Sequence, residues 1–552
     1  MNSHKNIITF VIILFSTSIS FAQTSVPDGW HLLSPTTDSF YGIDLARAYQ
    51  FLESKNKTSK KILIAVIDSG VDTTHEDLKS ILWHNPKEIP NNGIDDDKNG
   101  YVDDVYGWNY LGGSDGRNIK KASDEKSRIY HRFKQSFSGK ELDSSQWNLD
   151  QKFIYKSWLR SASEIEVSAE DQSSISYMEV AIKNIKTYDK TLRTEMGKEV
   201  YTTSELESFT PTSDIAKRGK MSYINIMKLL GVDTDTKNSD IIRELDEYIE
   251  NKKNAIESKN KEPYDYRADF IKDDYNNIKI KGYGNNDVMA VTPMHGTHVT
   301  GIIAAARNNG IGMNGVVENT EVMSLRVVPD GDEYDKDIAL AIFYAVDNGA
   351  KVINMSFGKS YSPDKRWIDS AIQYAALKDV LLVHAAGNES SDVDVKENYP
   401  MPFYIDGLRA PNFMTIGASS DPKISGSLAA DFSNYGKNIV DVFAPGVKIY
   451  STIPTGKEYG NQKGTSMASP VVAGLAALIR SYYPSLTAVQ VKDIIEQSVY
   501  IATDNVVVLK PGTKEKVSMK DLCRTGGIVN AYNAIILADK IAGNNIKKSK
   551  KK

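Results

Sequence analysis

The sequence is poor in cysteine and in histidine. It has one cysteine, Cys523, and eight histidines among 552 residues. A single cysteine excludes any disulfide within the chain, so we expect the fold to depend on a large core or on bound ions. No Cys-His motif surrounds Cys523, which favours a buried small side chain over a nucleophile.

The sequence also lacks a strong excess of charge. Lysine and arginine number 67 and the acidic residues 71, which leaves a net charge of −4. This balance gives no electrostatic case for a nucleic-acid partner. The apolar content of 41% and the charged content of 25% are typical of globular proteins. A chain of this length predicts one large domain with an insertion, or two to three domains.

Long hydrophobic runs are missing except near the N-terminus. There Lys5 precedes an apolar stretch at 7–15, and small and polar residues lead to Ala22. This pattern predicts a secretory signal over 1–22, cleaved after Ala22, and therefore a secreted or periplasmic protein with no stable membrane span. An uncleaved membrane anchor is the alternative, although the apolar core is short for a span. A lead segment, 23–60, follows.

Strands and helices are expected to alternate on both sides of a different, central block. The apolar run at 60–72 is typical of a buried parallel strand and ends in Asp-Ser-Gly. After about residue 290 we expect strands at 321–328, 351–358, 381–388 and 412–419, and helices at 337–350, 367–380 and 466–484. This alternation predicts an α/β fold with a doubly wound, mostly parallel sheet. Sites in such sheets lie at the carboxyl ends of strands, where Asp68, Asn388 and the residues after Met355 fall.

The central block, 111–290, is rich in Lys, Glu and Ile at helical spacing and has no strand-like runs. We interpret it as a charged helical insertion between two parts of one domain, 61–110 and 291–545. A basic tail, 546–552, ends the chain.

Three segments contain the residues of a nucleophilic site. "VIDSGVD" places Asp68 at a strand end, "HGTHVTG" contains His295, and "GTSMASP" places Ser466 at the start of a helix. Taken singly, these residues could be a cap, a core histidine and a helix N-cap. Taken together, they supply a serine nucleophile, a base for its proton, and a carboxylate to hold that base.

In this order, Asp then His then Ser, the segments resemble those of the subtilisin family of serine proteases, the subtilases, which are a known example of that order. The resemblance extends through "VINMSFG", "HAAGNE", "FAPG" and "GGIVNAYNA", and covers roughly 61–110 and 291–540.

The resemblance implies a serine endopeptidase that hydrolyses peptide bonds through an acyl-enzyme, with proteins or peptides as partners. Asp68 would orient the base, His295 would be the base, and Ser466 would attack the scissile carbonyl. Asn388 would donate to the oxyanion beside the Ser466 backbone N–H. The residues implied to bind substrate are Ser356, Phe357, Gly358, Ala386 and Gly387. These offer small side chains and backbone, so we expect broad or apolar substrates.

An alternative is a catalytically silent, subtilase-like protein that binds partners in a calcium-dependent way. It would require the loss of a catalytic residue, and none is missing here.

The insertion is where the sequence departs from the family. The predicted base follows the predicted carboxylate by 227 positions (295 − 68), whereas a few dozen are usual in subtilases. The insertion must therefore sit near the rim of the cleft, as a lid, a substrate-selecting element or a partner site. The lead segment is also shorter than the usual prodomain, so either no separate prodomain exists or the insertion supplies its role.

An acidic loop at 92–109 predicts structural Ca²⁺. Oxygen-bearing side chains alternate along it as in a calcium-binding loop, and Gly100 permits the sharp turn. Tyr106 stands where the final glutamate of such a loop is expected. The candidate ligands are Asp95, Asp97, Asn99 and Asp103, with Asp104 completing the shell. A solvated acidic turn is the alternative. Asp77, with the loop 308–312, resembles a second subtilase calcium site.

The pair His295 and His298 could instead suggest a zinc site. No HExxH pattern or nearby third ligand accompanies it, so we expect His298 to pack beneath the site.

Overall fold

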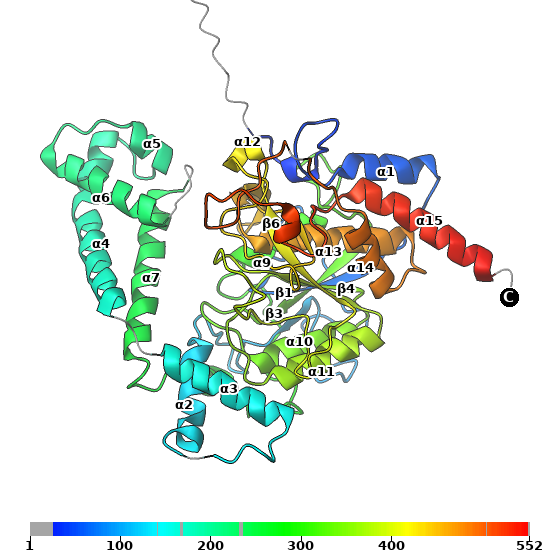
Figure 1. Ribbon diagram of the computed structural model, residues 1–552, viewed down its shortest axis with the longest axis horizontal. Helices are drawn as coiled ribbons and strands as arrows, with labels where there is room; N and C mark the ends of the chain where they lie inside the picture. Colours follow the sequence, from blue (N-terminus) through cyan, green and yellow to red (C-terminus); the bar gives the residue numbers. More distant parts are fainter. Residues whose placement is uncertain (1–25, 141, 166–168, 231–235, 504, 550–552) are drawn as a thin grey trace, which may run out of the picture.

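The computed structural model describes residues 26–140, 142–165, 169–230, 236–503 and 505–549 (Figure 1). The predicted signal, 1–22, and the last residues of the basic tail lie outside the described residues. Among the helices in those ranges, none has both the length and the apolar character needed to cross a membrane.

A seven-stranded sheet forms the centre of the protein. Its strands lie in the order β2-β3-β1-β4-β5-β6-β7, and every neighbouring pair is parallel. Their bounds are Ile62–Asp68 (β1), Gly107–Asn109 (β2), Thr320–Arg326 (β3), Val352–Met355 (β4), Leu381–Ala385 (β5), Phe413–Ser419 (β6) and Val442–Pro445 (β7). The predicted doubly wound α/β fold is confirmed. Chain order reverses at β1, so Asp68 ends the strand at the switch point.

Helices cover both faces of this sheet, because its strands are apolar on both sides. Along β1, Ile64 and Val66 face one core, and Ala65 and Ile67 face the other. The first core is closed by α1 (Leu45–Ser54), α9 (Met294–Ala304), α13 (Thr465–Tyr482), α14 (Ala488–Gln497) and α15 (Ala531–Ser549). The second is closed by α10 (Asp335–Asp347) and α11 (Lys365–Leu377), at the lower side of the sheet in Figure 1.

The smaller elements flank this arrangement. An antiparallel hairpin pairs β8 (Ile449–Ile453) with β9 (Glu458–Gln462) just before α13. The short helices are η1 (Trp30–Leu32), α12 (Pro422–Ser425) and η2 (Met519–Asp521). The hairpin lies over α9, the helix that begins at the site.

The block between β2 and α9 contains two helical groups. The first, α2 (Glu125–Phe137) and α3 (Leu149–Glu164), packs on the α/β body through Ile129, Trp158 and Tyr361. The second contains α4 (Ala169–Met196), α5 (Thr203–Ser208), α6 (Asp214–Leu230) and α7 (Asn238–Glu257), and α8 (Tyr266–Phe270) follows.

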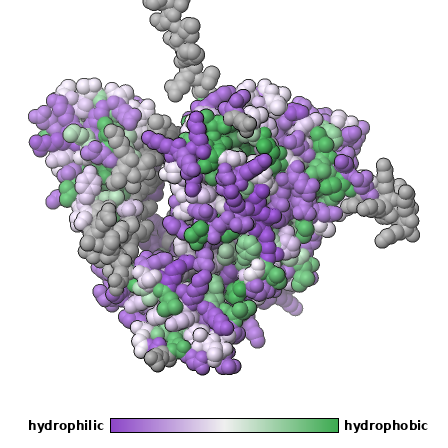
Figure 2. Space-filling model, viewed as in Figure 1, coloured by the Kyte–Doolittle hydropathy of each residue, from purple (hydrophilic) through white to green (hydrophobic). Residues whose placement is uncertain are grey.

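This second group has its own core, which includes Ile185, Tyr223 and Leu245. We call α4–α7 the arm; it stands beside the sheet at the left of Figure 1. Hydrophilic residues cover much of the visible surface of the arm and of the body (Figure 2).

Candidate active site

The ends of β1 and α9 bring the predicted carboxylate and base together. Asp68 is the last residue of β1 and is 1% exposed, while His295 lies in the first turn of α9. The His295 Nδ1 lies 2.8 Å from the Asp68 Oδ1. Gly296 makes this approach possible, because a Cβ there would lie 2.1 Å from the carbonyl oxygen of Gly70.

The carboxylate fixes the state of the imidazole. Burial acts to lower the pKa of His295, but the charge of Asp68 and its hydrogen bond outweigh this, so the pKa is raised. The Asp68 Oδ1 also accepts from the Ser69 N–H at 2.7 Å. With Nδ1–H donating to Asp68, the neutral ring presents the Nε2 lone pair as a base.

Ser466 lies in the first turn of α13, where backbone N–H groups have no acceptor within the helix. The Ser466 hydroxyl donates to the carbonyl oxygen of Ser356 (3.1 Å), and the Ser356 hydroxyl donates to the carbonyl oxygen of Ser466 (2.9 Å). The helix start is thereby tied to the end of β4. Transfer of the Ser466 proton to His295 requires the hydroxyl to turn away from that carbonyl.

Asn388 follows β5 and is anchored by the residue before Ser466. Its Oδ1 accepts from both the backbone N–H (2.9 Å) and the hydroxyl (3.0 Å) of Thr465. The Thr465 hydroxyl also accepts from the Gly387 N–H at 3.0 Å. Because the carbonyl of the Asn388 amide is occupied, its NH₂ group is the part left to donate to an oxyanion. Thr465 was not among the predicted site residues, although it stands inside the "GTSMASP" motif.

The predicted substrate segment follows β4. Ser356 and Phe357 are buried, whereas Gly358 is exposed and offers its backbone to an extended chain. A Cβ at Gly358 would lie 2.6 Å from the amide of Asn398. That same amide donates to the carbonyl oxygen of Ala386 at 3.0 Å, so Gly358 and Ala386 lie on either side of it.

His298 faces away from the site chemistry. Its Nε2 lies 3.1 Å from the carbonyl oxygen of Gly460 in β9, and the side chain is buried. Burial lowers the pKa of His298 to about 3, so the ring is neutral. His298 therefore packs against the hairpin, and its ring nitrogen at Nε2 is used by Gly460 and not by a metal ion shared with His295.

The acidic loop brings together a group of acidic side chains that differs in part from the predicted ligands. One oxygen each of Glu88, Asp95 and Asp97 lie within 4.8 Å of one another. Glu88 is 8% exposed, and its Oε2 is buried without a hydrogen-bond partner. Three carboxylates and an unpartnered buried oxygen suit a hard cation such as Ca²⁺. Glu88 lies outside the 92–109 pattern, and only the folded loop places it there.

The other predicted ligands of this loop have different partners. Asp103 accepts from the backbone N–H groups of Asn92 (3.1 Å) and Gly93 (2.8 Å). Asp104 accepts from the side chains of Asn85, Asn99 and Tyr344. Through these hydrogen bonds Asp103 and Asp104 help to hold the loop, and Asn99 lies against Asp104; all three stay predicted ligands.

Asp77 contacts the loop 308–312, with which the sequence analysis grouped it as a second calcium site. The Asp77 Oδ1 accepts from the Asn309 side-chain amide (2.6 Å), and its Oδ2 accepts from the Met313 N–H (3.3 Å).

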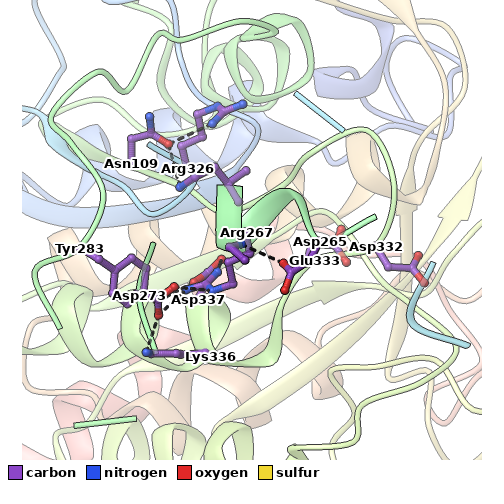
Figure 3. A network of polar contacts seen from close by, with 12 residues as sticks. Asn109, Asp265, Arg267, Asp273, Tyr283, Arg326, Asp332, Glu333, Lys336 and Asp337 are labelled. Carbon is purple, nitrogen blue, oxygen red and sulfur yellow. Dashed lines mark hydrogen bonds and ion pairs between the residues drawn. The ribbon is translucent and has the colours of Figure 1, made fainter. Parts of the chain in front are cut away.

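Buried ion pairs fix the second end of the insertion to α10 (Figure 3). Arg267 pairs with Asp273 (2.8 Å) and Asp337 (2.7 Å), and Lys336 pairs with Asp273 (2.6 Å). All four side chains are at most 3% exposed. Removing one partner from such a cluster leaves a buried charge uncompensated, so the network holds the return of the chain in one place.

A second buried cluster joins α2 to both rims of the predicted cleft. Lys359, which follows Gly358, donates to Glu125 (2.7 Å) and to the carbonyl oxygen of Glu333 (2.7 Å). Arg128 donates to the carbonyl oxygens of Asp332 (3.0 Å) and Glu333 (2.9 Å). The first helix of the insertion therefore helps to hold the segment after β3 beside the segment after β4.

The sequence is similar to those of known proteins. A model described as the subtilase family matches residues 59–521. A thermophilic serine proteinase of Bacillus sp. (strain AK1) is 37% identical over 278 residues, which are 49% of this chain and 60% of that protein. Subtilisin BL of Lederbergia lenta is 38% identical over 205 residues, which are 37% of this chain and 69% of that protein.

The solved structure of a protease from Pseudoalteromonas arctica PAMC 21717 aligns with a TM-score of 0.43 at 19% identity, over 93% of this chain and 98% of that one. This likeness is too loose to carry an argument about the fold. The family that the three motifs predicted is confirmed by the match over residues 59–521: the chain belongs to the subtilase family.

Proposed function

We propose that this protein is a secreted or periplasmic serine endopeptidase with Asp68, His295 and Ser466 as its catalytic triad. The observation that carries the proposal is the 2.8 Å contact between the His295 Nδ1 and the buried carboxylate of Asp68. Ser466, at the start of α13, is held at the end of β4 by its hydrogen bonds with Ser356. The membership in the subtilase family supports the same enzyme class.

The reaction runs through proton transfers on one imidazole, two in acylation and two in deacylation. The His295 Nε2 takes the Ser466 proton as the serine oxygen bonds to the scissile carbonyl carbon, and it then gives that proton to the leaving amine. The negative charge on the carbonyl oxygen is met by the Asn388 NH₂ group and the Ser466 backbone N–H. Water, deprotonated by the same ring, then attacks the acyl-enzyme ester, and the ring returns that proton to the Ser466 oxygen as the acid leaves.

Substrate binding involves the backbone at the end of β4. An extended peptide would pair with the exposed Gly358 backbone, with Ser356 and Phe357 on one side and Ala386 and Gly387 on the other. The parts at 61–110 and 291–545 would form the catalytic domain, with 111–290 inserted at its rim and 23–60 packed against its core.

Ca²⁺ would have a structural role in the acidic loop. Glu88, Asp95 and Asp97 would hold it, and the bound ion would neutralise carboxylates that otherwise repel one another. Asp77 and its loop are a second candidate position. For a chain that has one cysteine, such an ion would protect against local unfolding and self-digestion.

The test is the Ser466→Ala variant, assayed for casein hydrolysis and for labelling by a fluorophosphonate probe. Ser370→Ala, at an exposed position on α11, is the matched control and should behave as the parent protein. We expect Ser466→Ala to abolish both signals. An unlabelled but folded parent protein would support the catalytically silent, calcium-dependent binding protein instead.

A further inference from the structure

A cavity of about 700 Å³ lies where the base of the insertion meets the body. Three separate parts of the chain line it: the start of α2, the end of α7 with the residues that follow, and the segment after β3. Its lining includes Asp124, Ser127, Glu250, Glu262, Asp330 and Asp332. Nothing in the triad or the acidic loop uses it.

The cavity carries a net negative charge. Six carboxylates line it against two lysines, and each lysine is already paired: Lys121 with Glu250 (2.8 Å) and Lys261 with Glu257 (3.4 Å). Of the remaining four, Asp124 and Asp332 accept from backbone N–H groups of α2. Asp330 and Glu262 are exposed, and in the described part of the chain neither carboxylate has a hydrogen bond or an ion pair, although the charge of Asp330 also acts on Lys121. Two carboxylates are thus left to meet a cation.

A buried hydroxyl points to a ligand independently of the charge. Ser127 is 1% exposed, and its Oγ has no hydrogen-bond partner although it lies in the cavity wall. A buried polar atom is normally satisfied, so an unsatisfied one beside a cavity marks a place for a donor. An ammonium or guanidinium group supplies such donors and no acceptor.

The positions of the carboxylates decide whether the cation is a metal ion or a basic side chain. Among the described residues, the group of acidic side chains close enough to hold a metal ion is Glu88, Asp95 and Asp97, outside this cavity. The carboxylates of the cavity do not converge on one point. A long side chain with several donors fits this arrangement better than a single metal ion does.

The cavity also lies beside the path of the substrate. It includes Asp330 and Asp332, and Arg128 of α2 donates to the carbonyl oxygens of Asp332 and of the next residue, Glu333. Lys359 ties the carbonyl of Glu333 to the strand end that contains Gly358. An extended peptide advances about 3.3 Å per residue, so a side chain a few residues from the scissile bond would reach the cavity.

We propose that this cavity is a substrate subsite for a lysine or arginine side chain, three to six residues from the scissile bond on the side that pairs with Gly358. The inference rests on the proposed endopeptidase function. It gives part of the insertion the role of a substrate-selecting element, and it replaces the broad or apolar preference expected from the sequence with a preference for a basic residue away from the bond that is cut.

The test uses quenched fluorescent peptides that share one cleavage site. A single lysine is moved from the third to the sixth residue before the scissile bond, and glutamine replaces it in the matched set. We expect one position at which lysine raises kcat/KM by about tenfold, since one exposed ion pair gives about fivefold at most and two carboxylates are free. The preference should weaken as salt is added.

Variants assign that preference to the cavity. The double variant Asp330→Asn with Glu262→Gln, and separately Ser127→Ala, should reduce it while leaving the glutamine peptides unaffected. Asp493→Asn with Glu515→Gln removes two exposed charges elsewhere and should change nothing. No lysine preference at any position, or one that survives in both cavity variants, would overturn the inference. Fluorophosphonate labelling of each variant separates this from failure of the proposed function, because labelling depends on the triad and not on the cavity.

Discussion

His31 makes the stability of the fold sensitive to acid in a way that one substitution can remove. It lies in η1, is completely buried, and neither ring nitrogen has a hydrogen-bond partner. Burial lowers the pKa of His31 from 6.5 to about 4. The unfolded chain therefore binds a proton at this residue below about pH 6.5, whereas the folded chain does not until about pH 4.

The size of the effect follows from these two values. The folded pKa is depressed, so the unfolded state holds more protons between about pH 4 and 6.5, and stability falls as the pH falls through that window. Each unit of difference in pKa corresponds to about 1.4 kcal/mol, so His31 alone should lower the free energy of unfolding by about 2 kcal/mol between pH 7 and pH 5.

The His31→Leu variant should lose this part of the acid sensitivity. Leucine replaces a neutral ring that makes no hydrogen bond, so stability at pH 7 should be unchanged or slightly higher. Urea unfolding at pH 7 and pH 5, in a Ser466→Ala background that cannot digest itself, measures the difference. His84→Leu, at an exposed histidine, is the control. If the free energy of unfolding of His31→Leu falls as much as that of its parent between pH 7 and pH 5, burial of His31 is not a source of the acid sensitivity.

Three further outcomes are expected. Thr465→Val should lower kcat up to about tenfold with little change in KM on a chromogenic peptide, because it removes one of the two hydrogen bonds that hold the Asn388 carbonyl and keeps the bond from the backbone N–H; an unchanged kcat would contradict a role of the hydroxyl in that anchoring. EDTA should lower the urea midpoint of the parent protein, and Glu88→Gln should reduce that response; equal responses would argue against Ca²⁺ at this loop. The acid limb of kcat/KM should have its midpoint above pH 6.5, because Asp68 raises the pKa of the base and only the neutral ring accepts a proton. A midpoint below pH 6.5 would show that burial lowers the pKa of His295 by more than Asp68 raises it.

Much of the fold could be predicted from sequence because its strands are continuous apolar runs. The run at 60–72 became β1 and that at 412–419 became β6, each buried on both faces. The strands of the central sheet that went unpredicted are short: β2 has three residues and β7 has four. So few residues set no period, and tertiary pairing fixes these strands instead.

The site was predictable to the extent that each residue sits within a local motif. The contact between Asp68 and His295 joins residues 227 positions apart, yet each was recognised by its own neighbours. Glu88 could not be found in this way, because it precedes the acidic pattern and reaches the cluster only through the turn of the loop. The same limit applies to the cluster of Glu125, Arg128 and Lys359, which exists only once α2 has packed on the body.

The sequence pattern of the insertion predicted helices, but it did not predict that they form two separate groups. Helical spacing was evident at 179–200 and 239–262, which lie largely in α4 and α7. That these helices form a core apart from α2 and α3 depends on which apolar faces meet, and spacing alone does not determine that choice.

The proposed triad is tested most directly by the position of the fluorophosphonate adduct on the full-length parent protein, found by peptide mapping and mass spectrometry. We expect one adduct, on Ser466, formed far more slowly in His295→Ala and absent in Ser466→Ala. An adduct on another residue, or labelling that persists at the parent rate in His295→Ala, would contradict the proposed triad.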